Sequence, residues 1–275
     1  MKTLIIPNNL KQIELCNDYI DGFIVGVKGL SVNVNLYLTV DEINSLKTDK
    51  EIFVALNKNI HNYDLTNLTE ALTNLQNIKG VLYYDAAVVR IYNQLKPKYD
   101  LVWSQEHLAT SAVTCNYWHK NNVNYAYLSG EITLDEILEI SETTEMKLMV
   151  PIFGHLPMFV SKRHLVKNYL EYFNLKDDSK INYLEKEGHI YPIIDDEVTE
   201  VFSTNILNGI TALEQLENKV DYITLNAFNI EETKFLKVCE IYKTKKDLAK
   251  LDEMFENLDT GFLYKETIYK VKKND

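Results

Sequence analysis

The chain has 275 residues, of which 46% are apolar and 25% are charged, a composition typical of a globular protein with a sizeable core. Its net charge of −11 means that the electrostatic field of the whole protein does not attract naked nucleic acid. The N-terminal apolar run 4–6 is too short for a signal peptide, and no stretch approaches the roughly 18 apolar residues of a membrane helix. The three cysteines lie far apart, which argues against a disulfide framework. We therefore expect a cytoplasmic protein with no membrane contact.

Short apolar runs bounded by polar or turn residues predict parallel strands that are buried on both faces. They span residues 3–6, 22–27, 52–56, 80–84, 101–104, 125–129, 147–150 and 222–225. Helix signals lie between them, including apolar positions at helical spacing over 64–75 and a capping box from Thr133 to Glu136. This alternation predicts an α/β fold, a TIM-like (β/α) barrel.

The alternation breaks over residues 155–219, which we interpret as an inserted α+β segment before the last barrel strand. A helix-like segment is followed there by a polar stretch and two strand candidates, at 162–173, 176–187, 190–194 and 200–202. We expect a single barrel domain over residues 1–275, ending in a C-terminal helix and tail at 230–275.

Six blocks carry motifs that occur in a fixed order, at residues 104–106, 114–118, 127–137, 158–165, 191–197 and 259–267. They include Asn-Tyr-Trp at 116–118 and Thr-Gly-Phe at 260–262. Together the blocks resemble the peptidase U32 family over nearly the whole chain. The family likeness implies a barrel but does not settle the reaction.

The likeness is greatest to a short U32 subgroup, which implies a component of 5-hydroxylation of wobble uridine in tRNA. Such a component would act with a longer U32 paralogue and would contact tRNA through that complex. Two alternatives stay open: a collagenase-like peptidase, which is a hydrolase, and a non-catalytic partner subunit.

Departures from the family pattern bear on cofactors. Many U32 members hold an iron–sulfur cluster on cysteines. Two of those cysteines would lie at or beside the block 158–165, where this chain has Pro157 and His164 instead. No cysteine lies between Cys115 and Cys239, so a four-thiolate cluster cannot be built. We predict no cofactor for this chain and expect the paralogue to supply the cluster; metal content stays open.

Two glutamates at predicted strand ends are the candidate catalytic residues. Glu106 and Glu131 follow strands whose carboxyl ends form the rim that carries the active site in a barrel. There they would serve as general acid and base, or bind a cation or a substrate amine. The alternative for Glu131 is a stabilising position at the start of the next helix.

Five further residues are candidates for substrate binding. The planar guanidinium of Arg163 suits binding of a phosphate or a carboxylate, and His164 belongs to the same basic patch. The alternative interpretation of this patch is a solvated helix face without a ligand. Family likeness implies pocket positions for Asn57 and His61, with loop capping as the alternative, and Asn116 would orient substrate or pack the barrel.

The sequence predicts no metal site, because His155 and His164 have no identifiable third ligand. It also contains no motif of a serine or zinc peptidase. We expect Glu106, Glu131 and Arg163 to converge at one mouth of the barrel.

Overall fold

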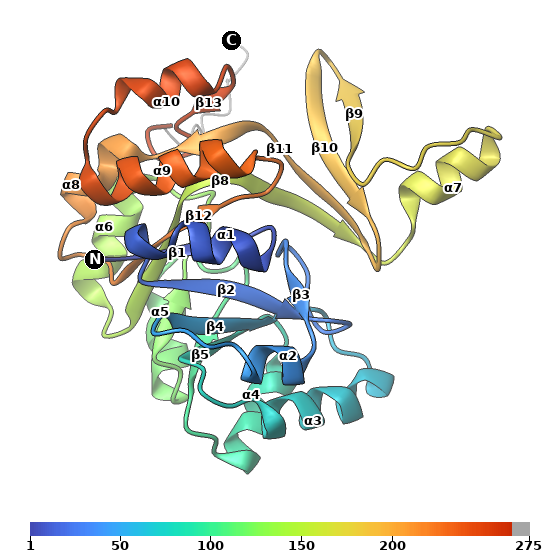
Figure 1. Ribbon diagram of the computed structural model, residues 1–275. Coiled ribbons are helices and arrows are strands. Elements are labelled where there is room, and N and C mark those ends of the chain that lie inside the picture. Colours follow the sequence, from blue (N-terminus) through green and yellow to red (C-terminus); the bar gives the residue numbers. More distant parts are fainter. Residues whose placement is uncertain (266–275) are drawn as a thin grey trace, which may run out of the picture.

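Eight parallel strands close into a barrel in the computed structural model, which describes residues 1–265 (Figure 1). The ring closes because the last strand pairs in parallel with both the first strand and the strand before the insertion. The strands are β1 (Lys2–Ile6), β2 (Gly22–Val27), β4 (Glu51–Leu56), β5 (Gly80–Tyr83), β6 (Asp100–Trp103), β7 (Tyr125–Tyr127), β8 (Lys147–Ser161) and β12 (Tyr222–Asn226). The TIM-like α/β barrel predicted from the alternation is therefore confirmed.

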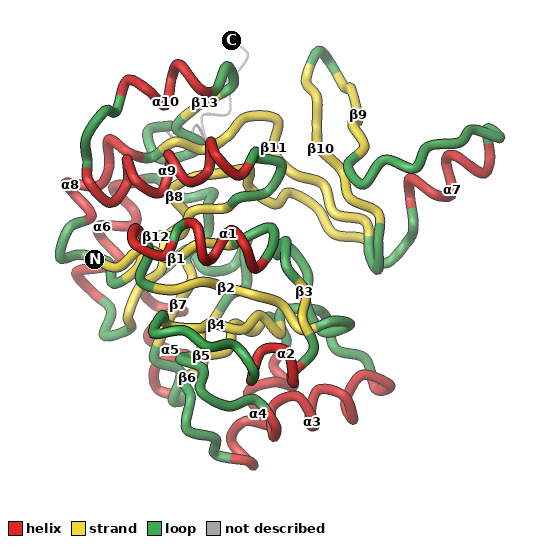
Figure 2. The backbone as a smooth tube through the Cα atoms, in the orientation of Figure 1, coloured by secondary structure: helices red, strands yellow, loops and turns green. Residues whose placement is uncertain are grey.

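Helices follow the strands and surround the barrel (Figure 2). They are α1 (Leu10–Leu15), α2 (Val40–Asn44), α3 (Leu65–Asn74), α4 (Ala86–Leu95), α5 (Ala112–Lys120), α6 (Leu134–Thr143), α8 (Leu213–Leu216), α9 (Glu232–Thr244) and α10 (Ala249–Met254). Shorter elements are β3 (Tyr37–Leu38), β13 (Leu258–Asp259) and the 3₁₀ turns η1 (Asn17–Tyr19), η2 (Asn62–Asp64) and η3 (Ile210–Ala212). Within residues 1–265, none of the helices combines the length and the apolar run that a bilayer crossing requires.

Local signals in the sequence explain where the helices begin. The capping box predicted for α6 is present, since Thr133 Oγ1 accepts the Glu136 N–H and the Glu136 carboxylate accepts the Thr133 N–H. Asp85 caps α4 in the same way by accepting the Ala87 N–H at 2.8 Å.

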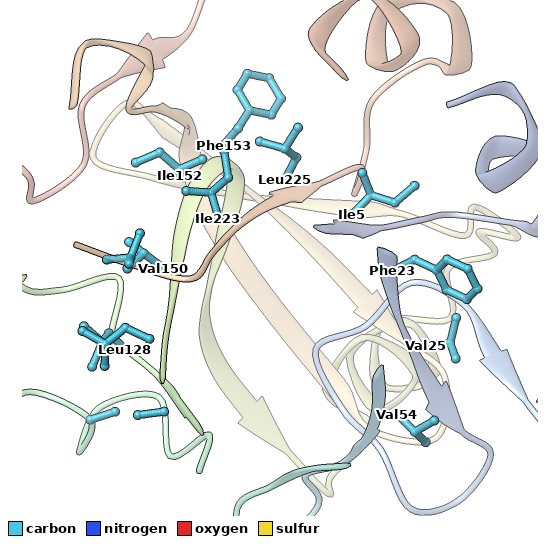
Figure 3. Packing of buried hydrophobic residues seen from close by; sticks show 14 of the residues in the cluster. Ile5, Phe23, Val25, Val54, Leu128, Val150, Ile152, Phe153, Ile223 and Leu225 are labelled. Carbon is cyan, nitrogen blue, oxygen red and sulfur yellow. The ribbon is translucent and has the colours of Figure 1, made fainter. Parts of the chain in front are cut away.

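Side chains that alternate along the strands separate two apolar layers. One set faces the helices and forms the larger core, part of which Figure 3 shows: Ile5, Phe23, Val25, Val54, Val150, Ile223 and Leu225. The other set fills the barrel interior: Leu4, Ile6, Ile24, Val34, Phe53, Ala55, Leu82, Val102, Tyr125, Met149 and Tyr222. This two-sided burial explains why the strands are nearly continuous apolar runs in the sequence.

The inserted segment forms an arm that extends away from the barrel (Figure 1). We define the arm as residues 157–203, which include the outer ends of two long strands. Its elements are the end of β8, α7 (Leu165–Tyr172), β9 (Asn182–Lys186), β10 (His189–Asp195) and the start of β11 (Thr199–Asn208). These strands pair antiparallel, β8 with β11, β11 with β10 and β10 with β9.

The strand predicted at 147–150 was too short, because β8 continues to Ser161. Pro151 suggested a strand end, yet β8 continues past it by changing partner from β12 to β11. Gly154 permits this change: its φ is +112° and a Cβ there would lie 2.4 Å from the Asn226 carbonyl oxygen. Residues 266–275 of the predicted tail lie outside the described residues.

Candidate functional site

A cavity of about 300 Å³ lies at the carboxyl ends of the barrel strands. Its apolar wall comes from inward-facing strand residues, namely Ile6, Ile24, Ala55 and Leu82. Its polar lining includes Asn33, Asn57, Ser104, Glu106, Tyr127, Glu131, His155, Thr204, Thr224 and Asn226. Barrel enzymes place their active sites at this rim, and a mostly apolar cavity with a few convergent polar groups is typical of a small-molecule site.

The period of two along each strand determines how the cavity is lined. On β6, Val102 packs inside the barrel, Ser104 follows two residues later, and Glu106 follows two residues after that. Two other strands repeat this change from bulky apolar to polar, with Phe53, Ala55, Asn57 and with Tyr222, Thr224, Asn226. The interior is therefore packed at one end and hollow and polar at the other.

Two carboxyl groups meet at Asn33, in the loop after β2. Asn33 donates from Nδ2 to Glu106 Oε1 at 2.5 Å, and its backbone N–H donates to Glu200 Oε1. Glu200 lies at the start of β11 and is only 3% exposed, and Tyr37 donates to the same oxygen at 3.5 Å. The arm therefore contributes a buried carboxyl group next to the cavity.

Burial raises the pKa values of both carboxyl groups. For Glu200, burial and the nearby Glu106 charge outweigh the hydrogen bond from Asn33 and raise the pKa to about 7. For Glu106, burial raises the pKa, and the Glu131 charge adds to the rise, against the hydrogen bond from Asn33 and the influence of His107. A carboxyl group with a pKa of about 7, such as Glu200, can hold and release a proton near neutral pH.

Glu131 lines the same cavity from a more exposed position. Its Oε2 lies 3.1 Å from His107 Nδ1, and its backbone N–H donates to Ser129 Oγ at 3.1 Å. Glu106 and Glu131 thus share one cavity, in two different environments: one is held by a buried amide and one is paired with an exposed imidazole.

Comparison with known proteins identifies the family. Residues 23–274 match peptidase family U32. The chain belongs to this family. As a U32 member, it is 30% identical over 254 residues to tRNA hydroxylation protein P2 of Bacillus subtilis (strain 168), covering 81% of this chain and 82% of that protein.

More distant U32 relatives share only part of this likeness. The chain is 26% identical over 141 residues to tRNA hydroxylation protein P of Haemophilus influenzae, covering 50% of this chain but 30% of that longer protein. A solved structure of a U32 peptidase superposes with a TM-score of 0.52 at 13% identity, covering 82% of this chain and 92% of that one. This last similarity concerns the fold alone.

Asn57 is the predicted substrate-binding residue that the structure places in the cavity lining of this U32 barrel. Its side chain is buried and holds the loop that carries Asn33: Oδ1 accepts the Val32 N–H and Nδ2 donates to the Val32 carbonyl, both at 2.9 Å. Both ends of the amide are therefore occupied, and Asn57 fixes the shape of the cavity wall. A role in binding substrate stays a prediction.

His61 and Asn116 lie outside the cavity lining that residues 1–265 provide. The His61 ring stacks on Tyr63 at 5.3 Å, and its backbone N–H donates to Asp64. Asn116, on α5, donates to the Thr143 carbonyl and accepts from Thr144, so it joins α5 to the end of α6. The structure therefore shows loop and helix contacts for these two residues.

Arg163 and His164 also lie outside the described lining of the cavity, because β8 and β11 carry them past the rim into the arm. The Arg163 side chain is exposed, and His164 Nδ1 lies 3.0 Å from Asp195 Oδ1. The expected convergence of Arg163 with Glu106 and Glu131 is not found. The arm instead places the Glu200 carboxyl group next to the cavity, through its contact with the Asn33 backbone.

The thiols of this U32 chain do not fit a four-thiolate cluster. Cys16 and Cys239 are buried in contact with each other, and Cys115 is buried on α5. Within the described residues, no three His, Cys, Asp or Glu side chains lie close enough together to hold a metal ion.

Sequence reasoning missed Asn33 and Glu200. Glu200 was visible only as the first residue of a strand candidate, and Asn33 as one of many asparagines. The two residues are 167 positions apart, and they meet because the start of β11 lies beside the loop after β2.

Proposed function

We propose that this U32 protein is a component of 5-hydroxylation of wobble uridine in tRNA. The observation that carries the proposal is its 30% identity to a tRNA hydroxylation protein over 81% of this chain and 82% of that relative. Because the match covers most of both chains, it favours a shared role of the whole fold.

The cavity supports an action on a single base. Enzymes that modify a base in RNA take it out of the stack into a pocket, where apolar walls and hydrogen bonds hold it. The cavity of about 300 Å³, with its apolar wall and polar rim, suits one such base. In this proposal Glu106 moves a proton at the base and Glu131 is the second carboxylate of the site.

The chain acts with a longer U32 relative in the cytoplasm, where tRNA is modified. That relative supplies the iron–sulfur cluster, for which this chain has no fitting set of thiols. The net charge of −11 gives this chain little attraction to RNA of its own, so the complex as a whole provides the tRNA-binding surface.

A deletion strain of the native host tests the role directly. Mass spectrometry of nucleosides from purified tRNA should show loss of 5-hydroxyuridine derivatives, and a plasmid copy of the gene should restore them. Unchanged modification in the deletion strain would rule the proposal out. Cleavage of peptides by the purified chain, abolished by Glu106→Gln, would instead support a hydrolase.

A further inference from the structure

Asn33 carries a buried hydrogen-bond acceptor that has no partner within residues 1–265. The residue is 8% exposed and lines the cavity, and its Oδ1 accepts no hydrogen bond there. Buried polar atoms are almost always paired, because an unpaired one loses its bonds to water without replacement. Such an atom at a cavity wall indicates that a ligand supplies the missing donor.

The surrounding residues fix the direction of this oxygen. Nδ2 of Asn33 donates to Glu106 Oε1, and an ionised carboxylate only accepts, so with Glu106 ionised the amide nitrogen faces Glu106 and Oδ1 is left over. The backbone of Asn33 is held by its N–H bond to Glu200 and by a φ of +57°, which asparagine adopts more readily than most residues. Glu106, in the loop after β6, and Glu200, from the arm, therefore both position this one acceptor.

A second unpaired group lines the same cavity. Thr204, on β11, has a buried Oγ1 with no partner in the described part of the chain. The Asn33 oxygen can accept from an N–H or an O–H, and the Thr204 hydroxyl can donate to a carbonyl oxygen. A ligand that presents an N–H donor and a carbonyl acceptor satisfies both groups.

We propose that Asn33 determines base specificity by accepting the imide N–H of a uracil base, with Thr204 donating to a carbonyl oxygen of the same ring. This inference rests on the proposed function and names the group that reads the base. Uracil carries an N–H between two carbonyl groups, whereas cytosine has an unprotonated nitrogen at that position. An acceptor facing that nitrogen therefore favours uracil over cytosine.

The first test uses the deletion strain with Asn33→Gly supplied on a plasmid. Glycine tolerates the positive φ, so the fold should persist, and the substitution removes the amide together with its bond to Glu106. We expect the level of modified wobble uridine to fall by at least about tenfold. The matched control is Asn77→Gly, an exposed asparagine with a φ of +55° that lies outside the described cavity lining, and it should restore the wild-type level.

The second test measures what the amide reads. The tagged chain, isolated with its partner from host cells, is offered anticodon stem-loops with uridine or 3-methyluridine at the wobble position. The methyl group removes the imide N–H, so the wild-type complex should prefer uridine by about tenfold or more, and Asn33→Gly should lose that preference. Thermal melting of the Asn33→Gly protein separates a folding defect from lost recognition.

The outcomes separate this inference from the proposed function. If deletion leaves wobble uridine modified, the proposed function fails, and this inference with it. If deletion abolishes the modification but Asn33→Gly restores it fully, the inference alone is overturned. Equal binding of the two stem-loops by the wild-type complex, or a preference retained by Asn33→Gly, also overturns it.

Discussion

The two ends of the barrel interior differ in what fills them. At the amino ends of the strands, Phe53 packs edge-to-face against Tyr125 and Tyr222, with ring centroids 6.2 and 5.4 Å apart. Gly80 makes room for the Phe53 ring, since a Cβ there would lie 3.2 Å from it. At the carboxyl ends the same strands present small and polar residues around a cavity of about 300 Å³.

This contrast separates stability from recognition within one set of strands. The packed end gains the free energy of buried apolar surface, and aromatic pairs with this geometry add to it. The hollow end forgoes that packing and holds buried carboxyl groups with raised pKa values, Glu106 and Glu200, which lower stability at neutral pH. Carboxyl groups with such raised pKa values cluster at binding and catalytic sites.

The sharpest test of the contrast compares two residues of β1 that both face the interior. Leu4 is fully buried in the packed end, and Ile6 borders the cavity. Leu4→Ala should lower the free energy of unfolding by about 4 kcal/mol and Ile6→Ala by about 2 kcal/mol, because the second site already adjoins empty space. Urea denaturation at pH 7 measures both. Equal losses would show that the two ends are equally well packed.

The next largest effect is a pH dependence of the folding stability, caused by a carboxyl group at the hollow end. The pKa of Glu200 is raised from 4.5 to about 7 in the folded protein, so the folded state holds a proton that the unfolded state has released. Stability therefore falls as the pH rises from about 4.5 to 7. Above pH 7 the stability stays at this lower level. Glu200→Gln removes this loss and should gain about 3 kcal/mol relative to the wild type between pH 4.5 and pH 8.

The environment of Glu200 determines the controls for this experiment. Glu106, Tyr37 and Asp196 are the groups whose charge or hydrogen bond affects its pKa besides Asn33. Glu106 has a raised pKa of its own, so a weaker slope of the same sign should remain in the Glu200→Gln variant. Glu197→Gln, at an exposed position of the same arm, should leave the slope unchanged. Parallel stability curves for wild type and Glu200→Gln would contradict the raised pKa.

Asn57 holds the loop that carries Asn33 at the hollow end and should show an intermediate effect. Asn57→Ala leaves the buried N–H and carbonyl of Val32 without partners, so it should cost about 2 kcal/mol. Asn116→Ala removes two bonds nearer the surface and should cost less than about 1 kcal/mol. Thermal or urea unfolding of both variants provides the measurement. A loss at Asn57 no greater than that at Asn116 would show that this amide does not hold the loop.

The contrast also explains how much could be predicted from the sequence. The barrel strands were predictable because burial on both faces makes each one a continuous apolar run, as in residues 22–27 and 52–56. Helix starts such as Thr133 were predictable because capping residues lie three positions apart. Each of these signals is local in the chain.

The site was less predictable because its decisive contacts are not local. Glu106 and Glu131 could be placed in the cavity from the rule that strand ends share one rim. Asn33 meets Glu106 across 73 positions and Glu200 across 167, and no local pattern indicates either contact. Arg163 was misplaced because the strand that leads to it passes Pro151 and continues into the arm.

The smallest effect on stability is expected in the arm, at Arg163. Its side chain is exposed, and its described contacts use backbone atoms: its N–H donates to Ser161 Oγ and its carbonyl accepts from Thr199 Oγ1. Arg163→Ala should therefore change the free energy of unfolding by less than about 0.5 kcal/mol. If its guanidinium binds an RNA phosphate, the same variant should weaken anticodon stem-loop binding and reduce the slope of log affinity against log salt by about 1. Lys162→Ala is the matched control, since the Lys162 ammonium lies over the Tyr63 ring at 5.9 Å. If Arg163→Ala has the same salt slope as the wild type, the Arg163 guanidinium does not bind an RNA phosphate, and recognition of the RNA does not involve this side chain.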